Sequence, residues 1–322
     1  MRHPPRNRQA RFVPRGRRFQ RPGDRARFSS GTPAKTPAEE SFLSKTSIDP
    51  RHRLRLEAGS TDLTMRAMDL LCPIGKGQRG LIVSPPKAGK TTFLKQICLS
   101  LAKTEPSLKL YCLLVDERPE EVTDFKRSVS AEVHASPSDR SYDEHIQVAQ
   151  KLMTQAITEA DAGKDVVILL DSLTRLARVH NQNTEGNKTM SGGLDSRALE
   201  IPRRFFGAAR NIEEGGSLTI LATILVGTGS RMDDVIFQEF KGTGNMELVL
   251  SRPAAEQRVF PAINVHASGT RKEELLVPPE ELQKIYKMRR ALSGMEEVAA
   301  ASIIVELLQR YPTNAEALKS IE

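Results

Sequence analysis

Short apolar runs alternate with longer amphipathic segments from residue 80 onward. The runs that predict strands cover residues 81–84, 108–116, 131–135, 166–171, 218–226 and 246–251. Between and after them, apolar residues recur at helical spacing over residues 90–103, 118–129, 140–162, 172–180 and 196–212. Alternation of this kind is typical of βαβ units around a parallel sheet that is buried on both faces. The pattern therefore predicts an α/β fold with a mostly parallel, twisted sheet flanked by helices.

Three parts of the chain are distinguished by the same pattern. Residues 1–45 are rich in Arg, Pro and Gly and cannot bury enough apolar area to offset their ordering entropy, so we expect a disordered tail. Residues 46–79 form a connector, in which helical spacing over 63–71 stops at a Pro- and Gly-containing turn. Residues 80–322 form the main domain. Its C-terminal part is expected to contain an extended segment at 260–266 and helices at 279–291, 296–310 and 314–321.

The net charge of +8 belongs to the tail. Residues 1–28 carry ten Arg and a single acidic residue, Asp24, so the rest of the chain sums to −1. Guanidinium groups neutralise phosphates and stack on bases, and Phe12, Phe19 and Phe28 are interleaved among them. The tail is therefore predicted to be an RNA-binding arm. A solubilising leader and a transit peptide remain alternatives, although the segment is poor in Ser and interrupted by Pro.

Composition also disfavours several classes of protein. No window approaches about 18 consecutive apolar residues, as a membrane span would require, and the tail has no apolar core for a secretory signal. Cys72, Cys98 and Cys112 are odd in number, form no C-x-x-C pair and lie in apolar contexts. They indicate reduced core cysteines in a cytoplasmic protein with no membrane contact.

The segment Gly80-Leu-Ile-Val-Ser-Pro-Pro-Lys-Ala-Gly-Lys-Thr-Thr92 carries the clearest chemistry in the chain. An apolar strand enters a loop of small residues that ends in Gly-Lys-Thr and opens a helix, which is the arrangement of a phosphate-binding loop. Lys90 would add a point charge and the Thr91 hydroxyl would ligate Mg²⁺. The alternative is a surface turn, because Ser84 stands where such loops usually begin with Gly. The positions predicted to contact a nucleotide are Pro86, Lys87, Ala88, Gly89, Lys90, Thr91 and Thr92.

Acidic residues follow two of the predicted strands, where ligands of an open α/β sheet gather. Asp171 ends an aliphatic run, as the second acidic residue of P-loop NTPases does, and would support the metal. Its alternative role is a helix N-cap before Ser172. Glu117 would orient and polarise the attacking water, and its alternative is a surface carboxylate near a helix dipole. Glu120 and Glu121 suit that second role better.

Two arginines late in the chain are candidates for a group delivered from a neighbouring subunit. Arg258 and Arg271 each follow an extended segment. A guanidinium arriving at a closed interface would meet the charge that develops on the γ-phosphate. Each could equally be an exposed salt-bridge partner.

From about Leu54 to its C-terminus, the chain closely resembles the ATPase core of the bacterial transcription termination factor Rho family. The resemblance lies in several blocks that occur in one order, which makes it more specific than any single motif. The blocks are Pro-Ile-Gly-Lys-Gly-Gln-Arg-Gly-Leu-Ile-Val (73–83), Pro-Pro-Lys-Ala-Gly-Lys-Thr (85–91), Asp-Glu-Arg-Pro-Glu-Glu-Val-Thr (116–123), Leu-Leu-Asp-Ser-Leu-Thr-Arg-Leu-Ala-Arg (169–178), Arg-Phe-Phe-Gly-Ala-Ala-Arg-Asn (204–211) and Glu-Phe-Lys-Gly-Thr-Gly-Asn-Met-Glu-Leu (239–248).

This resemblance implies a RecA-like P-loop NTPase that binds ATP and Mg²⁺. It implies a ring homohexamer that threads single-stranded RNA, hydrolyses ATP between subunits and moves 5′ to 3′ as a helicase in transcription termination, with RNA polymerase as a partner. It places Arg118 and Arg175 at the nucleotide interface, Phe260 against adenine, and Arg258 and Arg271 toward the neighbour's nucleotide.

The resemblance also implies two RNA-gripping loops in the central channel. The first is residues 181–194, with Lys188 and Gly192, and the second is residues 227–234, with Arg231 where the family usually has Lys. Both are cations, so contact with phosphate is expected to survive the exchange.

The chain departs from the family at its front, where some 45 low-complexity residues stand in place of a helical segment and an OB-fold. This departure bears on base-selective loading and leaves the expected ATP hydrolysis and RNA binding in the central channel unchanged. One alternative is an RNA-binding regulatory or assembly paralogue without autonomous termination activity. Another is the related rotary family of ATP synthases and export ATPases, whose phosphate loop has a different pattern and follows an N-terminal β-barrel.

Overall fold

The computed structural model describes residues 35–59, 62–182, 191–195 and 197–321. The residues from 32 to 322 cluster into one compact unit, so the predicted connector folds together with the predicted main domain. The predicted RNA-binding arm lies outside the described residues, except for its last part.

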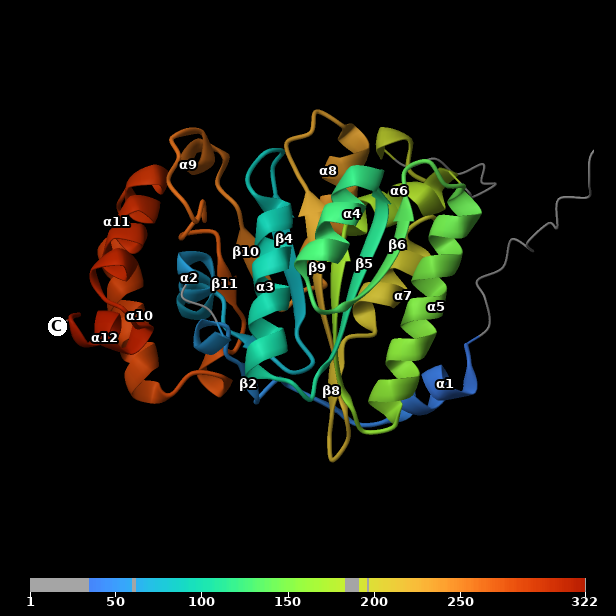
Figure 1. The fold of residues 1–322 in the computed structure, drawn as a ribbon, viewed down its shortest axis with the longest axis horizontal. Coiled ribbons are helices and arrows are strands. Elements are labelled where there is room, and N and C mark those ends of the chain that lie inside the picture. The colour runs from blue at the N-terminus through green and yellow to red at the C-terminus, as the bar shows by residue number, and fades with distance from the viewer. Residues whose placement is uncertain (1–34, 60–61, 183–190, 196, 322) are drawn as a thin grey trace, which may run out of the picture. The chain divides into compact units, whose positions relative to one another are not determined.

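One central sheet organises the unit (Figure 1). Six of its strands are parallel, and a short seventh strand at one edge is antiparallel to its neighbour. Their spatial order is β11 (Gly269–Thr270), β10 (Met246–Val249), β4 (Arg79–Ser84), β9 (Ser217–Leu225), β7 (Asp165–Asp171), β5 (Lys109–Glu117) and β6 (Glu132–Pro137). The predicted mostly parallel α/β fold is confirmed, and every predicted strand in the alternating region forms.

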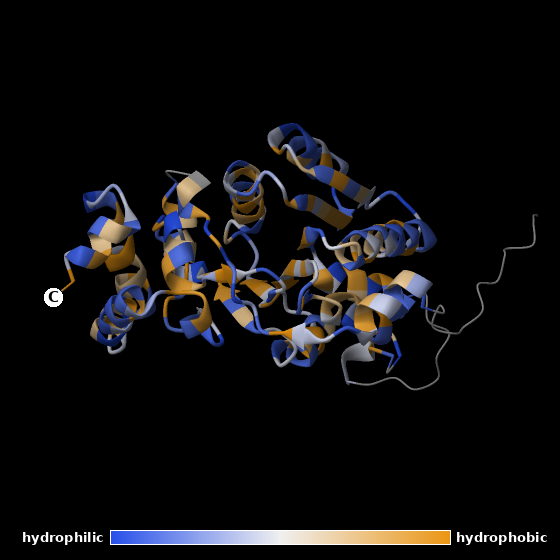
Figure 2. Ribbon diagram, turned by 90° about the horizontal axis from the view of Figure 1, so that it is seen from below, coloured by the Kyte–Doolittle hydropathy of each residue, from blue (hydrophilic) through white to orange (hydrophobic). Residues whose placement is uncertain are grey.

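Both faces of the sheet are buried because successive side chains of each strand enter different hydrophobic layers. In β7, Val167 and Leu169 belong to one cluster, whereas Val166, Ile168 and Leu170 belong to the other. The helices that contribute buried residues to the first cluster are α2 (Leu63–Leu71), α3 (Lys90–Thr104), α4 (Pro119–Ser128), α10 (Pro279–Leu292), α11 (Glu297–Arg310) and α12 (Asn314–Lys319). Those that contribute to the second are α1 (Pro37–Ser44), α5 (Tyr142–Asp161), α6 (Leu173–Gln182), α7 (Glu200–Gly207) and α8 (Arg231–Lys241). The helical ribbons carry both hydrophobic and hydrophilic residues, as expected for helices that pack one face against the sheet (Figure 2).

The prediction of one long helix over residues 196–212 is wrong for the second half of that segment. The helix α7 ends at Gly207, and residues Arg210–Ile212 form strand β8. This strand pairs with β9 and also with β1 (Ser47–Ile48), both antiparallel. A partner more than 160 residues earlier in the chain leaves no trace in local periodicity, so the apolar spacing alone suggested a continuing helix.

Part of the predicted disordered tail is helical in the structure. Thr36 and Glu39 form a capping box, and Pro37 occupies the first turn of α1. Buried Phe42 anchors this helix in the second hydrophobic cluster. The ordering entropy is thus offset by docking against α5, a tertiary contact that composition does not reveal.

Several short elements complete the unit. The predicted extended segment 260–266 makes an isolated bridge between Ile263 and Leu250 and is otherwise irregular. The elements not yet named are β2 (Arg53–Leu54), which pairs with β3 (Ile74–Gly75), helix α9 (Arg252–Glu256), and the 3₁₀ turns Glu57–Gly59, Ser191–Gly193 and Glu273–Leu275. Among the helices that the structure describes, none has the length and hydrophobicity of a transmembrane span.

Candidate functional site

The phosphate loop joins the end of β4 to the start of α3, as predicted. Gly89 has φ +91° at the N-cap of α3, a conformation that an L side chain rarely adopts. No side chain caps this helix, so its first N–H groups remain available to a ligand. Lys87 also has positive φ (+65°) and is exposed at the loop surface. This geometry is that of an anion-binding loop with the Lys87 ammonium beside it.

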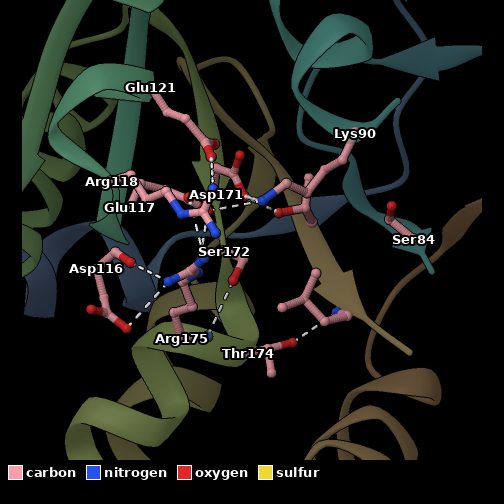
Figure 3. Close-up of polar contacts among 12 residues, drawn as sticks. Ser84, Lys90, Asp116, Glu117, Arg118, Glu121, Asp171, Ser172, Thr174 and Arg175 are labelled. Carbon is pink, nitrogen blue, oxygen red and sulfur yellow. Dashed lines mark hydrogen bonds and ion pairs between the residues drawn. The ribbon is translucent and has the colours of Figure 1, made fainter. Parts of the chain in front are cut away.

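Lys90 lies between two carboxylates at the floor of this loop (Figure 3). Its ammonium Nζ donates to Asp171 Oδ1 at 2.5 Å and to Glu117 Oε1 at 2.9 Å. Asp171 and Glu117 are only 2% and 3% exposed, so neither is a surface carboxylate. The structure therefore brings together the three residues that the sequence placed at the ends of β4, β5 and β7.

Asp171 is held from behind by the neighbouring strand. Thr223 in β9 donates its hydroxyl to Asp171 Oδ1 at 2.8 Å. The alternative role of Asp171 as an N-cap does not hold, because the Ser172 hydroxyl accepts the Arg175 N–H at the start of α6. The Asp171 carboxylate instead points to Lys90 (Figure 3).

Arg175 adds a second cation on the opposite side of Glu117. Its Nε lies 3.2 Å from Glu117 Oε1, and it also donates to the backbone oxygen of Asp116. Arg118, predicted for the same interface, is exposed and approaches Glu121 at 3.9 Å. The two arginines therefore differ, since Arg175 is fixed by the site and Arg118 is free to turn toward a ligand.

Burial and charge act against each other in this cluster. Burial, followed by the nearby Asp171 charge, raises the pKa of Glu117, although Lys90 and Arg175 oppose that rise. Burial would lower the pKa of Lys90, but the Asp171 and Glu117 carboxylates outweigh it and the pKa is raised. The ammonium thus stays charged, and it holds two carboxylates that would otherwise repel each other.

The oxygen donors suit magnesium. Within the described residues, the Thr91 hydroxyl has no hydrogen-bond partner, and Asp171 Oδ2 accepts no hydrogen bond. Hydroxyl and carboxylate oxygens are the ligands that Mg²⁺ prefers, and the ion commonly completes its shell with substrate phosphates and water. No group of three or more His, Cys, Asp or Glu in the described chain could hold a metal. A bound Mg²⁺ would therefore depend on nucleotide oxygens.

Arg258, Phe260 and Arg271 are exposed, and Arg258 and Phe260 follow β10, the strand that pairs with β4 ahead of the phosphate loop. Phe260 is 47% exposed, which is unusual for a large apolar side chain. Neither Arg258 nor Arg271 forms an ion pair within the described residues, so the salt-bridge alternative finds no partner there. In the described chain, none of the three forms a hydrogen bond or ion pair with Lys90, Glu117 or Asp171.

The described end of the first loop predicted to grip RNA lies against the second. A Cβ atom on Gly192, whose φ is +75°, would come within 2.9 Å of the Arg231 backbone. Arg231 is the first residue of α8, so the second predicted loop ends earlier than residue 234. Its side chain is exposed. Lys188 lies outside the described residues.

Sequence reasoning missed two contacts that support the site. One is the Thr223 hydroxyl on Asp171, which a polar residue inside an apolar strand could have signalled. The other is Asp233, fully buried in α8, which receives two hydrogen bonds from Arg178 of α6 and one from Thr228. Helix α6 follows Asp171, so this ion pair ties the nucleotide site to the segment that carries Arg231.

Comparison with known proteins agrees with this geometry. Residues 64–270 match the ATP synthase alpha/beta family, nucleotide-binding domain. The chain is 54% identical over 285 residues to transcription termination factor Rho of Pseudomonas fluorescens, covering 87% of this chain and 68% of that protein. It is 55% identical over 279 residues to the Rho of Haemophilus influenzae, covering 85% and 66%. The Rho of Micrococcus luteus is 53% identical over 291 residues, covering 90% of this chain and 42% of its own.

Solved structures share the fold. A type III secretion ATPase from pathogenic bacteria superimposes with a TM-score of 0.70 at 24% identity, covering 85% of this chain and 86% of that one. The assembled secretion ATPase of enteropathogenic E. coli gives 0.67 at 22% identity, covering 85% and 72%. At such identities the likeness concerns the fold alone. The phosphate loop, the buried acidic pair and the extent of sequence identity together show that this chain belongs to the family of transcription termination factor Rho and carries its P-loop ATPase domain.

Proposed function

We propose that the protein is an RNA-dependent ATPase that moves 5′ to 3′ along single-stranded RNA as a helicase and acts in transcription termination. Its working form would be a ring homohexamer in the cytoplasm, in contact with the transcribing RNA polymerase. The observation that carries this proposal is the Lys90 ammonium held between Glu117 and Asp171 at the end of the phosphate loop. Membership of the Rho family supports the choice of RNA as the polymer.

The loop and Lys90 would bind the ATP phosphates. The backbone N–H groups of residues 87–92 would donate to phosphate oxygens, whereas Pro86 has no N–H to donate. Lys90, whose ammonium is held by the two carboxylates, would add positive charge beside the phosphates. Thr91 and Asp171 would hold Mg²⁺, which supplies positive charge against the phosphate oxygens when bound. Lys87 and Arg118 are exposed cations that follow the carboxyl ends of β4 and β5.

Glu117 would act on the attacking water. Its carboxylate is fixed by Lys90 and Arg175 on two sides, so an accepting oxygen keeps one orientation. Phosphoryl transfer depends on positioning and on charge stabilisation, and a fixed acceptor supplies positioning. Arg175 would stabilise the charge of Glu117 throughout.

A neighbouring subunit would complete the site. Arg258 and Arg271 are exposed and without ion pairs in the described chain, and Phe260 offers an exposed ring for adenine. Guanidinium groups arriving from the neighbour would meet the charge that develops on the γ-phosphate. RNA would be held by Lys188, Gly192 and Arg231.

ATP hydrolysis measured with no polymer, with poly(C), with poly(U) and with single-stranded DNA tests the proposal directly. We expect strong stimulation by RNA and little by DNA. A preference for poly(C) would mean that base selection operates in this chain. Turnover that is indifferent to every polymer would overturn the helicase assignment and favour a regulatory or assembly role.

A further inference from the structure

A polar cavity lies at the opposite end of strand β4 from the phosphate loop. Its volume is about 350 Å³, and it is lined by residues 47–51, by Gly77 and Arg79 before and at the start of β4, by Arg210 at the start of β8, and by Asn245 just before β10. Strand β4 runs from Arg79 to Ser84, so the two sites are separated by roughly 17 Å of strand. None of the residues discussed for ATP or RNA lines this cavity.

The charge of the cavity is positive and uncompensated. Arg51, Arg79 and Arg210 line it, and none of the three forms an ion pair within the described residues. The one acidic lining residue, Asp49, is paired with Lys272 at 2.8 Å. Burial, followed by the nearby Arg79 charge, lowers the pKa of Arg210, as expected for two neighbouring guanidinium groups that have no ion-pair partner in the described chain.

Two of these guanidinium groups are fixed by backbone carbonyls. Arg79 donates through Nε to Thr243 O and through Nη1 to Ala209 O. Arg210 donates through Nε to Ala208 O and through Nη1 to Leu43 O, and it stacks over the ring of Phe42. The site is therefore built in advance, so a ligand would meet little ordering cost.

Each side chain keeps a donor that no described residue uses. Arg79 Nη2 and Arg210 Nη2 have no partner in the described chain. The Asn245 side chain uses its Oδ1 to accept from Gln78 and from the Arg79 N–H, which leaves its amide Nδ2 free to donate. Arg51 is exposed at the rim and its side chain makes no hydrogen bond in the described chain. The lining residues thus keep several unused donors, and the one lining carboxylate, Asp49, already has a cation as its partner.

We propose that this cavity binds a phosphate group, held by the guanidinium groups of Arg51, Arg79 and Arg210 and by the Asn245 amide. Planar guanidinium donors match the oxygens of phosphate, and no described carboxylate forms an ion pair with any of the three arginines. The group is either a backbone phosphate of RNA or a small free phosphate compound. The site stands independently of the function proposed above, because its residues take no part in ATP hydrolysis.

Arg51→Gln tests the site with little risk to folding, since the Arg51 side chain is exposed and unpaired in the described chain. Arg55→Gln is the matched control, because Arg55 is exposed on the same connector and does not line the cavity. The phosphate loop is first filled with Mg²⁺ and a non-hydrolysable ATP analogue, and pyrophosphate is then titrated by calorimetry. We expect binding by the parent protein and by Arg55→Gln, and affinity about tenfold weaker in Arg51→Gln, the loss expected for one charged hydrogen bond.

A second variant and a competition complete the test. Ser47→Asp adds a negative charge at the rim and is expected to weaken pyrophosphate binding as well, since the Ser47 hydroxyl has no partner to lose in the described chain. Displacement of pyrophosphate by a short oligocytidine would identify RNA as the source, and its absence would identify a free phosphate compound. Equal affinity in the parent and all three variants, or no binding to the parent, would overturn the proposal.

Discussion

At the scale of single residues, the site depends on contacts that hold its charged groups in place. The Thr223 hydroxyl on Asp171 is such a contact, buried within the sheet. Thr223→Val keeps the shape and removes the donor, so the carboxylate loses one of its two described partners. We expect ATP turnover to fall by about tenfold, as for other outer-shell partners of metal-supporting groups, with about 1 kcal/mol lost from the free energy of unfolding.

Thr219→Val is the matched control for this experiment. Thr219 is a buried threonine of the same strand whose hydroxyl accepts the Gly77 N–H rather than contacting Asp171. Its replacement should cost similar stability and leave turnover near the parent value. Equal loss of turnover in both variants would mean that Thr223 acts only through the stability of β9.

Another residue-scale effect concerns the buried imidazole of His180 in α6. Burial lowers the pKa of His180 to about 4 from its ordinary 6.5. Between pH 4 and pH 6.5, His180 therefore binds a proton in the unfolded chain but not in the folded chain. Its contribution to the free energy of unfolding is complete above pH 6.5 and is lost as the pH falls toward 4. The difference corresponds to about 3 kcal/mol.

Urea unfolding of the parent and of His180→Gln at pH 7 and at pH 4.5 measures this contribution. Glutamine keeps hydrogen-bonding capacity without titrating, so the variant should lose less stability on acidification than the parent does. His52→Gln replaces an exposed histidine of the connector and should lose as much stability on acidification as the parent does. An identical pH response in parent and His180→Gln would show that the imidazole is not the responsible group.

At the scale of elements, α6 and α8 are joined by the ion pair of Arg178 with Asp233. Asp233 is fully buried and Arg178 Nε donates to it at 2.8 Å. Asp233→Asn removes the charge, leaves Arg178 poorly paired and should lower stability by about 3 kcal/mol. Because α8 carries Arg231, we expect RNA stimulation of ATP hydrolysis to fall more than the rate without RNA.

The neighbouring Asp234→Asn is the control for this prediction. Asp234 is exposed in the same first turn of α8, so its replacement removes an equal charge without breaking the buried pair. Stimulation by poly(C) in both variants is compared with the rate in its absence. Parallel losses in stimulated and unstimulated rates would refute a link between α6 and α8.

The elements also show what local pattern could and could not predict. The helix over 63–71 has the predicted bounds, and the strands of the parallel sheet lie within a few residues of the predicted runs, because burial on both faces makes each a continuous apolar segment. Strand β8 was predicted as helix because its pairing with β1 is distant in sequence. The phosphate loop, Glu117 and Asp171 could be placed because each follows a strand, whereas the Thr223 contact depends on how strands neighbour one another.

At the scale of the whole molecule, no domain boundary separates residues 46–79 from the ATPase elements. The pairing of β1 with β8 and the packing of α2 in the same hydrophobic cluster as α3 join the connector to the sheet. The cavity with Arg79 and Arg210 lies at this junction. A ligand bound there would contact both the connector and the sheet, so its binding free energy would add to the stability of their junction.

The assembly itself can be tested through the arginines that the site of one subunit does not use. Arg271→Ala should lose ATP turnover by about a hundredfold or more while still binding ATP, because the nucleotide is held by the loop of its own subunit. Lys90→Ala should lose turnover through the loop itself. In the proposed ring, neither variant alone would form a working interface.

Mixing the two variants separates action in the neighbouring subunit from action within one. In a mixed ring, the intact loop of an Arg271→Ala subunit can face the intact Arg271 of a Lys90→Ala subunit, so some interfaces regain both groups. We expect the RNA-stimulated rate of the mixture to exceed the sum of the separate rates. If subunits are shown to exchange and the mixture is no faster than the sum of the two variants alone, Arg271 does not act in the neighbour's site. If Arg271→Ala no longer binds ATP, Arg271 acts in the nucleotide site of its own subunit.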